Sequence, residues 1–375
     1  MKKYKLGDIC EITSGSTPKT GVSEYWDGNI KWITPAELND DTYIITDSVR
    51  KITELAVKQT GLSPIPKGTV ILSSRAPIGK VAIAGCEMYC NQGFKNLICS
   101  EKIDNRYLYW FLKGNTEFLN SLGRGATFKE ISKSIVASIE INVPDLKEQL
   151  VVVENLEKIN RIITLRKKEL NELDNLIRAR FVEMFGDPIS NPYRYDKVPL
   201  SELADIKIGP FGSLLHKEDY IEGGHPLLNP SHIADGKILS DDKLTISDEK
   251  YEELSAYQLK TGDVVMGRRG EMGRCAVVPR DGFLCGTGSI LIRTKGEITA
   301  DYIQKIISFP SFKKSIEDMA VGQTMPNLNV PIVSRFQIIK PPLEVQDRYY
   351  KFVAQVDKSK LQYHPHTHTC QPNTS

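Results

Sequence analysis

The sequence predicts an α+β protein in which two similar α+β domains are separated by long α-helices, packed as an antiparallel, coiled-coil-like spacer. Three observations support this fold class. Residues 146–185 carry an uninterrupted helical pattern of apolar side chains. Short β-like runs broken by Gly, Pro and Asn lie on both sides of that pattern. The same order of short sequence landmarks occurs before it and again after it.

The stretch 146–185 is typical of one long helix. It contains no Gly or Pro, Pro144-Asp145 is a start signal, and Gly186-Asp187-Pro188 is a stop signal. At about 1.5 Å per residue the helix would be roughly 60 Å long. Its apolar side must be buried, most simply against another helix, although one core helix within a single domain is the alternative. The apolar residues at helical steps are Val153, Leu156, Ile159, Ile163, Leu170, Leu173, Ile177, Phe181 and Met184.

The landmarks on the two sides indicate a duplication. Arg269 lies 194 positions after Arg75, and Gln346 lies 197 positions after Gln149. A small change of offset is what loop variation produces in a retained fold. We therefore expect two equivalent domains, each followed by a helix. The expected boundaries are 1–145 for the first domain, 146–187 for the central helix, 188–342 for the second domain, 343–363 for a shorter C-terminal helix and 364–375 for a disordered tail.

Composition restricts the class of protein. The chain has 375 residues, of which 40% are hydrophobic and 26% charged, with a net charge of +2. No run approaches the roughly 20 apolar residues of a membrane span. The N-terminus has no apolar stretch typical of a signal peptide. The seven cysteines are scattered without a CxxC pair. Together these features favour a cytoplasmic protein with reduced thiols.

A set of short motifs, repeated around the long helix, resembles the specificity subunit of type I restriction–modification enzymes. The resemblance covers about residues 4–361, and its specificity comes from the order of the motifs rather than from any single one. The motifs are Lys5-Leu6-Gly7-Asp8-Ile9, Ser14-Gly15-Ser16-Thr17-Pro18, Trp32-Ile33-Thr34-Pro35, Gly68-Thr69-Val70-Ile71, Ser74-Arg75 with Ile78-Gly79, Asn91-Gln92-Gly93, Val143-Pro144 with Glu148-Gln149, and Phe185-Gly186-Asp187-Pro188.

The resemblance implies a function without catalysis by this chain. Each α+β block would be a target recognition domain that reads one half of a split, asymmetric site in double-stranded DNA. The helices would set the gap between the halves and dock two methyltransferase (modification) subunits, which restriction subunits join. S-adenosylmethionine, ATP and Mg would be bound by the partner subunits, in a prokaryotic cytoplasm. Two readers on a spacer suit half-sites about one helical turn, roughly 34 Å, apart.

DNA contacts require polar or basic side chains on loops that can reach a groove or a phosphate. Two loops are the strongest signals: 123–129, which is basic and hinged by glycines, and Gly267-Arg268-Arg269-Gly270. In the first domain the expected DNA-binding residues are Ser16, Lys19, Ser73, Ser74, Arg75, Lys80, Gln92, Lys95, Arg124, Thr127 and Lys129. In the second domain they are Ser213, His216, Lys217, Ser231, His232, Arg268, Arg269, Arg274, Gln323, Thr324 and Asn327.

The C-terminal helix is only about half as long as the central one, because its pattern begins at Leu343 and fades at Tyr363. We therefore expect the stripe from Leu173 to Met184 to lack a partner within the chain. A second copy, through self-association of the spacer helices, or a modification subunit would cover that stripe.

Two other classes of function remain open. A stand-alone DNA methyltransferase or endonuclease would need intact catalytic motifs. Asn191-Pro192-Tyr193 lacks the second proline of the amino-methyltransferase motif, and Asp241-Asp242-Lys243 suggests a hairpin tip rather than a nuclease site. Cys86 and Cys90 lack the further ligands of a closed zinc site. A tandem protein-interaction scaffold is the other class, and it would show no salt-dependent affinity for DNA.

Overall fold

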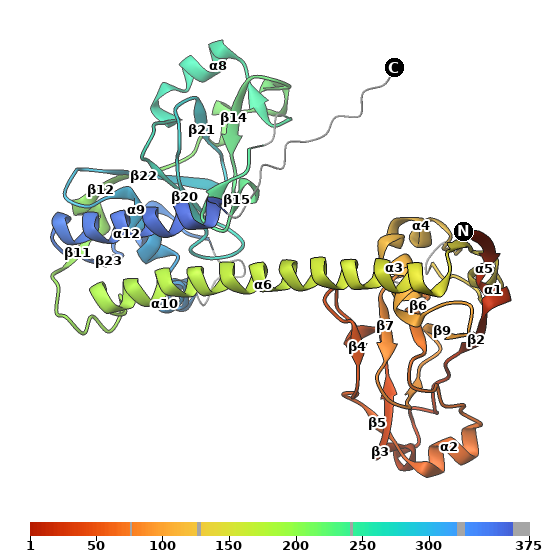
Figure 1. The fold of residues 1–375 in the computed structure, drawn as a ribbon. Coiled ribbons are helices and arrows are strands. Elements are labelled where there is room, and N and C mark those ends of the chain that lie inside the picture. The colour runs from red at the N-terminus through yellow and green to blue at the C-terminus, as the bar shows by residue number, and fades with distance from the viewer. Residues whose placement is uncertain (76, 126–128, 241–242, 321–326, 363–375) are drawn as a thin grey trace. The chain divides into compact units, whose positions relative to one another are not determined.

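A computed structural model describes the chain except for residues 76, 126–128, 241–242, 321–326 and 363–375, and except for the side chains of Ser213, Ala320, Leu361 and Gln362. The chain divides into two compact units, unit 1 (Met1–Leu165) and unit 2 (Arg166–Ser375) (Figure 1). Helix α6, Leu146–Phe185, begins in unit 1 and ends in unit 2, and it spans the same residues as the helical pattern in the sequence. The expected tail, 364–375, lies outside the described residues. None of the helices that the structure describes could span a membrane.

Unit 1 is built on a sheet with strand order β2-β9-β6-β7-β4, beside a smaller sheet β5-β3-β8 and the antiparallel pair β1-β10. Helix α3 packs against β6 and β7. Its elements are β1 Lys2–Lys5, α1 Leu6–Ile9, β2 Cys10–Ser14, η1 Ser23–Tyr25, β3 Trp26–Ile33, η2 Pro35–Glu37, β4 Ile44–Ile45, β5 Lys51–Ile52, α2 Glu54–Thr60, β6 Val70–Ser73, β7 Val81–Ala84, β8 Tyr89–Cys90, β9 Phe94–Cys99, α3 Asn105–Gly114, α4 Thr116–Ser121, α5 Lys133–Ser138 and β10 Glu140–Val143.

Unit 2 contains a four-stranded sheet, β12-β22-β19-β20, and a five-stranded sheet, β13-β17-β14-β21-β18, with the pairs β11-β23 and β15-β16. Its elements are β11 Lys197–Pro199, α7 Leu200–Leu203, β12 Ala204–Ile208, η3 Gly212–Leu214, η4 Lys217–Asp219, β13 Tyr220–Ile221, β14 His225–Leu228, η5 Pro230–His232, β15 Ile233–Ala234, β16 Lys237–Ile238, β17 Thr245–Ile246, α8 Asp248–Glu253, η6 Ser255–Tyr257, β18 Gln258–Leu259, β19 Val264–Gly267, β20 Cys275–Val277, β21 Phe283–Cys285, β22 Ser289–Thr294, α9 Ala300–Ile307, α10 Pro310–Ala320, α11 Val330–Ser334, β23 Gln337–Ile339 and α12 Leu343–Gln362.

The two units repeat the same arrangement of elements. Strand β3 pairs in parallel with β8 through Trp32 and Tyr89, and β14 pairs in parallel with β21 through Leu227 and Leu284. The central hairpins match as well, because β6 lies between β7 and β9 as β19 lies between β20 and β22. Helices α3 and α9 cover these hairpins in the two units.

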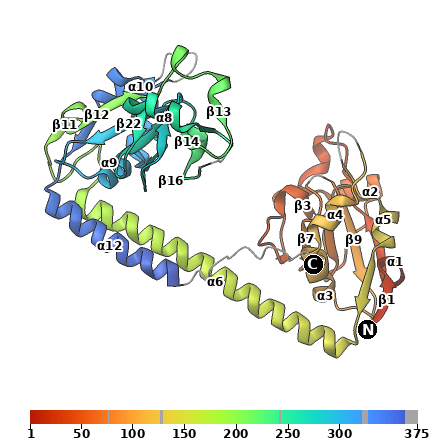
Figure 2. The same ribbon diagram turned by 90° about the horizontal axis from the view of Figure 1, so that it is seen from above.

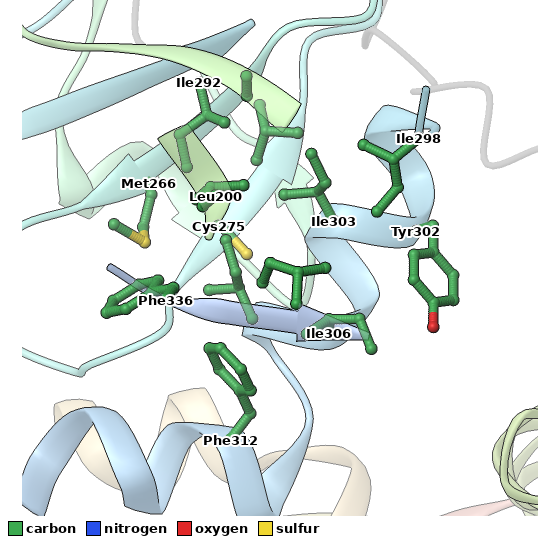
Figure 3. Packing of buried hydrophobic residues seen from close by; sticks show 14 of the residues in the cluster. Leu200, Met266, Cys275, Ile292, Ile298, Tyr302, Ile303, Ile306, Phe312 and Phe336 are labelled. Atoms are coloured by element: carbon green, nitrogen blue, oxygen red, sulfur yellow. The ribbon is translucent and has the colours of Figure 1, made fainter. Parts of the chain in front are cut away.

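The core of unit 2 joins its sheet to the helices that follow. Figure 3 shows Leu200, Met266 and Cys275 in one apolar cluster with Ile303 and Ile306 of α9, Phe312 of α10 and Phe336. All seven side chains are buried. This shared apolar core fixes α9 and α10 to the sheet, since each buried aliphatic side chain contributes about 1.5–3 kcal/mol.

The C-terminal half of α6 packs against α12 in antiparallel orientation (Figure 2). The Tyr349 hydroxyl donates to the Ile177 carbonyl at 3.3 Å, and the Tyr349 ring lies 5.5 Å from that of Phe181. Further along α12, Lys360 Nζ lies 2.7 Å from Asp174 Oδ1. Residue numbers therefore rise along one helix as they fall along the other.

The expectation that Leu173–Met184 would lack a partner within the chain is wrong. Ile177 and Phe181 are buried, and Leu173 and Met184 pack against the same core cluster as Tyr349. The physical reason is the antiparallel geometry, which places the start of α12 beside the end of α6. A short α12 thus covers the C-terminal end of α6. The apolar side chains that remain exposed on α6 include Ile159, Ile162, Ile163 and Leu165, which precede the stripe that α12 covers.

One buried glutamine ties the start of each long helix to its unit. Gln149 and Gln346 are both 0% exposed. The Gln149 side chain accepts from the Asp104 N–H at 2.8 Å and donates to the carbonyls of Lys102 and Pro144 at 3.0 Å. Gln346 accepts from the Thr299 N–H at 3.0 Å and donates to the Pro341 carbonyl at 2.9 Å. Asp104 and Thr299 are the N-caps of α3 and α9.

Removing either amide should destabilise its unit. In Gln149→Ala and in Gln346→Ala the N-cap N–H and the carbonyl groups lose their buried partner, so we expect the free energy of unfolding to fall by about 1–3 kcal/mol. Urea unfolding followed by circular dichroism measures this decrease. Lys147→Ala and Glu344→Ala, exposed neighbours in the first helical turns, should change stability by less than about 0.5 kcal/mol. An equal decrease in the control variants would contradict this interpretation.

Candidate nucleic-acid interface

A close crossing of two loops builds the edge of unit 1 where the expected DNA-binding residues gather. A Cβ on Gly15 would lie 2.0 Å from the Asn91 carbonyl oxygen, so only glycine allows the segment after β2 to cross the turn between β8 and β9. The Ser16 N–H donates to the Cys90 carbonyl at 2.9 Å. The Thr17 hydroxyl donates to Gln92 Oε1. The crossing therefore places Ser16 beside the turn that carries Gln92.

Unit 2 repeats this crossing with other residues. A Cβ on Gly209 would lie 2.0 Å from the Gly286 carbonyl oxygen. Asn229 Oδ1 accepts weakly from the Gly288 N–H at 3.5 Å, as Asn91 Oδ1 accepts from the Gly93 N–H at 2.9 Å. The backbone is thus kept while the exposed side chains differ, which is the arrangement expected of two related readers.

Five polar residues of unit 1 meet at the end of β6, and we call them the unit 1 cluster: Ser74, Arg75, Lys95, Arg124 and Glu130. The Glu130 carboxylate binds two cations, Arg75 Nε at 3.0 Å and Lys95 Nζ at 3.3 Å. Lys95 Nζ also lies 3.3 Å from the Ser74 hydroxyl oxygen. Lys95 is only 5% exposed. Because a buried ammonium group requires a partner, Glu130 stabilises the charge of Lys95.

Backbone hydrogen bonds hold the unit 1 cluster to the sheet. Ser74 donates its N–H to the Gly93 carbonyl at 2.7 Å and accepts from the Ile131 N–H at 2.9 Å. Arg124 and Glu130 exchange two backbone bonds of 3.0 and 2.9 Å, which closes the base of the loop between them. Arg124 and Lys129 are exposed at this loop. The basic loop predicted from the sequence therefore adjoins the turn that carries Gln92.

The unit 2 cluster, Arg268, Arg269 and Asn327, occupies the equivalent place. Arg268 donates its N–H to the Gly288 carbonyl at 3.0 Å and accepts from the Leu328 N–H at 2.9 Å, which is the pattern of Ser74. Arg268 Nε donates to Asn327 Oδ1 at 3.1 Å and to the Leu328 carbonyl at 3.2 Å. Burial lowers the pKa of the Arg268 guanidinium, and the nearby charge of Arg269 lowers it further. Arg269 itself is exposed.

The charges of the two clusters differ at matching positions. Lys95 pairs with Leu72 in the β6–β9 register, and Ile290 pairs with Met266 in the β19–β22 register. Ile290 therefore stands where unit 1 has the buried Lys95. Leu328 of unit 2 makes the same backbone hydrogen bond as Ile131 of unit 1, so the preceding residues, Asn327 and Glu130, occupy equivalent positions. Unit 2 therefore has a neutral amide where unit 1 has a carboxylate. One fold thus presents two different chemical surfaces.

Four of the expected residues are engaged inside their units. The Ser73 hydroxyl donates to the Pro77 carbonyl at 2.7 Å, and Lys80 Nζ donates to the Leu38 carbonyl at 2.6 Å. Arg274 Nη1 donates to the Pro230 carbonyl at 3.1 Å. The His232 ring is buried, with Nδ1 at 2.8 Å from the Leu227 carbonyl oxygen. These contacts brace the loops that carry the exposed residues.

The remaining expected residues fall into two groups. Those exposed on loops, turns or 3₁₀ helices are Ser16, Lys19, Gln92, Lys129, His216, Lys217 and Ser231. Those outside the described residues are Thr127, Gln323 and Thr324, together with the side chain of Ser213. Sequence reasoning missed Glu130, an acidic residue in a basic loop. The repeat could have indicated it, because Glu130 and Asn327 share the offset of 197 positions found for Gln149 and Gln346.

The sequence that partly matches a methyltransferase motif forms a turn. Asn191 accepts from the Tyr195 N–H at 3.0 Å and donates to the Tyr195 carbonyl at 2.6 Å, with its own backbone at a φ of 47°. This closes the chain after α6, in agreement with the linker predicted there. Asp241 and Asp242, the expected hairpin tip, lie outside the described residues.

A family model for the type I restriction modification DNA specificity domain matches the chain twice, over residues 1–175 and 192–366. Among curated proteins, the type I restriction enzyme MjaIX specificity subunit of Methanocaldococcus jannaschii is 31% identical over 373 residues, covering 93% of this chain and 85% of that relative. The MjaVIII specificity subunit of the same organism is 21% identical, covering 94% and 85%. The EcoR124I/EcoR124II specificity subunit of Escherichia coli is 29% identical, covering 42% and 40%.

Solved structures show the same fold. The type I restriction-modification S subunit from M. genitalium has a TM-score of 0.56 at 17% identity, covering 96% of this chain and 90% of that one. A chain from work on complex assembly and conformational transition of the type I R-M system has a TM-score of 0.60 at 18% identity, covering 96% and 91%.

These findings confirm the predicted fold class. Two similar mixed α/β domains carry the long helices α6 and α12, which contact each other as the spacer. The resemblance stated from the motifs is confirmed as well, since the match is tandem and nearly complete. In its complex this subunit supplies sequence recognition and is not the catalytic component. The chain belongs to the family of DNA specificity subunits of type I restriction–modification systems.

Proposed function

We propose that the two units read the two halves of an asymmetric bipartite site in double-stranded DNA, unit 1 one half and unit 2 the other. The observation that carries this proposal is the pair of clusters at the end of β6 and β19. They share backbone geometry, yet they differ at the Lys95/Ile290 and Glu130/Asn327 positions. A duplicated scaffold with unlike polar edges suits two unlike half-sites, whereas identical edges would suit a palindrome.

The proposed DNA contacts divide by chemistry. Arg124, Lys129 and Arg269 are exposed cations on loops and suit phosphate contacts. Apart from Ser73, Ser74, Lys80, Lys95, His232 and Arg274, the remaining residues of the expected DNA-binding set are the other proposed contacts, with Arg75 and Arg268 as readers of base edges. We assign these six residues a supporting role. The side chains of Ser73, Ser74, Lys80, His232 and Arg274 bind carbonyl groups inside the units, and the Lys95 ammonium group binds the Glu130 carboxylate.

For the organisation of the chain we propose recognition domains at 1–145 and 188–342, with spacer helices at 146–187 and 343–363. The bounds of α6 and α12 support this division. We propose that S-adenosylmethionine, ATP and Mg are bound by the partner subunits, in the cytoplasm of a prokaryote. Relatives named as specificity subunits of restriction enzymes support the existence of such partners.

The partners proposed are two modification subunits docked on the spacer helices, with restriction subunits joining them. The exposed apolar side of α6 supports this docking. Ile159, Ile162, Ile163 and Leu165 are each about half exposed, at 53%, 58%, 48% and 55%. Contiguous apolar residues on a helix surface mark a protein-binding site more often than scattered ones do. Within the described residues, α12 contacts the other end of α6.

Exchange of one domain should alter one half-site. A chain in which residues 188–342 are taken from the 31%-identical relative should retain the first half of the methylated sequence and acquire a new second half. Genome-wide mapping of methylated adenines, in cells carrying either chain with its modification subunit, measures this. The reciprocal exchange of residues 1–145 is the matched control and should alter the other half. A change in both halves from a single exchange would refute the two-reader proposal.

Removal of a cation that binds phosphate should weaken binding regardless of DNA sequence. Arg124→Ala and Lys129→Ala should each reduce the slope of log K against log salt concentration by about 0.9, because each removes one ion pair with the DNA backbone. The measurement is fluorescence anisotropy of labelled DNA at several salt concentrations, with the chain in its complex with the modification subunit. Lys2→Ala, an exposed lysine on β1, is the control and should leave the slope unchanged. If all three variants kept the wild-type slope of log K against log salt concentration, phosphate binding at this loop would be ruled out.

A charge on the exposed side of α6 should block assembly. Ile162→Asp and Ile163→Asp place a carboxylate where an apolar contact is proposed, so we expect affinity for the modification subunit to fall at least tenfold, by about 1.4 kcal/mol or more. Co-purification and sedimentation measure it. Thr164→Asp adds the same charge on the opposite side of the helix and should assemble normally. Undiminished assembly of both isoleucine variants would exclude this surface.

A further inference from the structure

An arginine of unit 1 is held by only one edge of its guanidinium. Arg75 Nε donates to Glu130 Oε2 at 3.0 Å, while the second carboxylate oxygen receives Lys95 Nζ at 3.3 Å. The Arg75 side chain is 47% exposed. No hydrogen bond joins its two Nη groups to a residue that the structure describes. The guanidinium is thus fixed through Nε, with the other edge available.

Unit 2 holds an arginine in the same manner but from a neighbouring position. Arg268 Nε donates to Asn327 Oδ1 at 3.1 Å and also to the Leu328 carbonyl at 3.2 Å. Here too, no hydrogen bond joins the Nη groups to the described part of the chain. By backbone pairing Arg268 matches Ser74, not Arg75. The reading arginine of unit 2 therefore stands one residue earlier along the chain than that of unit 1.

The residue that holds each arginine occupies one shared place in the fold. Glu130 directly precedes Ile131, whose N–H binds the Ser74 carbonyl at 2.9 Å. Asn327 directly precedes Leu328, whose N–H binds the Arg268 carbonyl at the same distance of 2.9 Å. The same loop thus returns to the sheet edge in each unit and supplies an oxygen acceptor for an arginine Nε.

The acceptor is charged in one unit and neutral in the other for a physical reason. Lys95 is a buried member of the unit 1 cluster, and a buried ammonium group that loses its carboxylate partner is strongly destabilising. In unit 2 the matching side chain is Ile290, so no buried charge needs compensation. A neutral amide there is sufficient to hold the arginine.

The free edge of a guanidinium fixed through Nε has two parallel N–H donors. That fork matches the O6 and N7 acceptors of guanine in the major groove, the commonest specific contact in protein–DNA complexes. We propose that Glu130 and Asn327 are positioning residues, which hold Arg75 and Arg268 so that each reads a guanine, one in each half-site. This inference rests on the proposed function and adds to it the residues and the base.

The test uses variants that keep the fold free of an unpaired buried charge. Lys95→Met with Glu130→Gln removes both charges of unit 1 but retains an oxygen acceptor for Arg75 Nε, as Ile290 and Asn327 do in unit 2. Lys95→Met with Glu130→Ala removes the acceptor as well. Asn327→Ala removes the side-chain acceptor in unit 2 and leaves the Leu328 carbonyl as the other acceptor of Arg268 Nε. Thermal unfolding first verifies that each purified chain is folded.

The readout is the rate of adenine methylation by the assembled complex on oligonucleotides that differ at one base of one half-site. We call Lys95→Met with Glu130→Ala the alanine form, and Lys95→Met with Glu130→Gln the glutamine form. In the alanine form, discrimination for guanine at one position of the unit 1 half-site should fall by roughly 5- to 150-fold, the range of one bidentate contact. The glutamine form should retain discrimination. Arg75→Lys should reduce it as the alanine form does, and adding Arg75→Lys to the alanine form should cause no further decrease at that position. Asn327→Ala should affect only the other half-site.

The outcomes separate this inference from the proposed function. Without a bipartite methylated sequence for the wild-type chain, the proposed function itself fails. A bipartite sequence that lacks guanine in either half overturns the inference alone. So does unchanged base discrimination in the folded variant with Lys95→Met and Glu130→Ala, because a purely structural role would lower stability without changing the base that is read. Relaxation of both half-sites by one variant also overturns it.

Discussion

The buried glutamine amide at the start of each long helix is the interaction on which the rest of the arrangement depends. Gln149 and Gln346 join their helices to the N-caps of α3 and α9 through hydrogen bonds that water cannot replace, because both side chains are fully buried. Helices α3 and α9 in turn cover the central hairpins of the sheets. A rotation of the long helix relative to its sheet would break these bonds, so helix and sheet edge are held as one piece within each unit.

From that fixed sheet edge, two glycines determine where the polar loops can lie. Gly15 and Gly209 let one loop cross another at a distance that any side chain would forbid. In unit 1 the crossing brings the segment after β2 beside the turn that carries Gln92. In unit 2 it brings the segment after β12 beside the turn that carries Thr287. Backbone contacts thus define a common platform, and the side chains on it remain free to differ. This separation of platform from side chain is what allows one fold to recognise different sequences.

The sequence was informative about periodic features and less so about the site. The pattern over residues 146–185 predicted both ends of α6, and the offset between Gln149 and Gln346 predicted the repeat, because burial imposes period and order. The sequence did not distinguish the residues that hold the loops in place from the residues that are exposed on them. Lys80 and Arg274 look like DNA contacts in sequence, yet each binds a proline carbonyl at the equivalent 3₁₀ turn, Pro35 or Pro230. Their roles depend on which carbonyl groups the fold brings within reach, and that is not encoded locally.

The unlike charges of the two clusters follow from one substitution in the layer beneath. The buried Lys95 is compensated by the Glu130 carboxylate, whereas Ile290 carries no charge and the acceptor in that unit is the neutral amide of Asn327. The acceptor and the buried residue thus differ together. The arginine stands at position 75 in unit 1 and, as Arg268, at the equivalent of the preceding residue, Ser74, in unit 2, and it is held through Nε in both. A shift by one residue along the chain changes the position of the guanidinium, while the same place in the fold supplies its acceptor. Half-site preference can thus diverge between duplicated domains while their sheets, glycines and glutamine anchors remain the same.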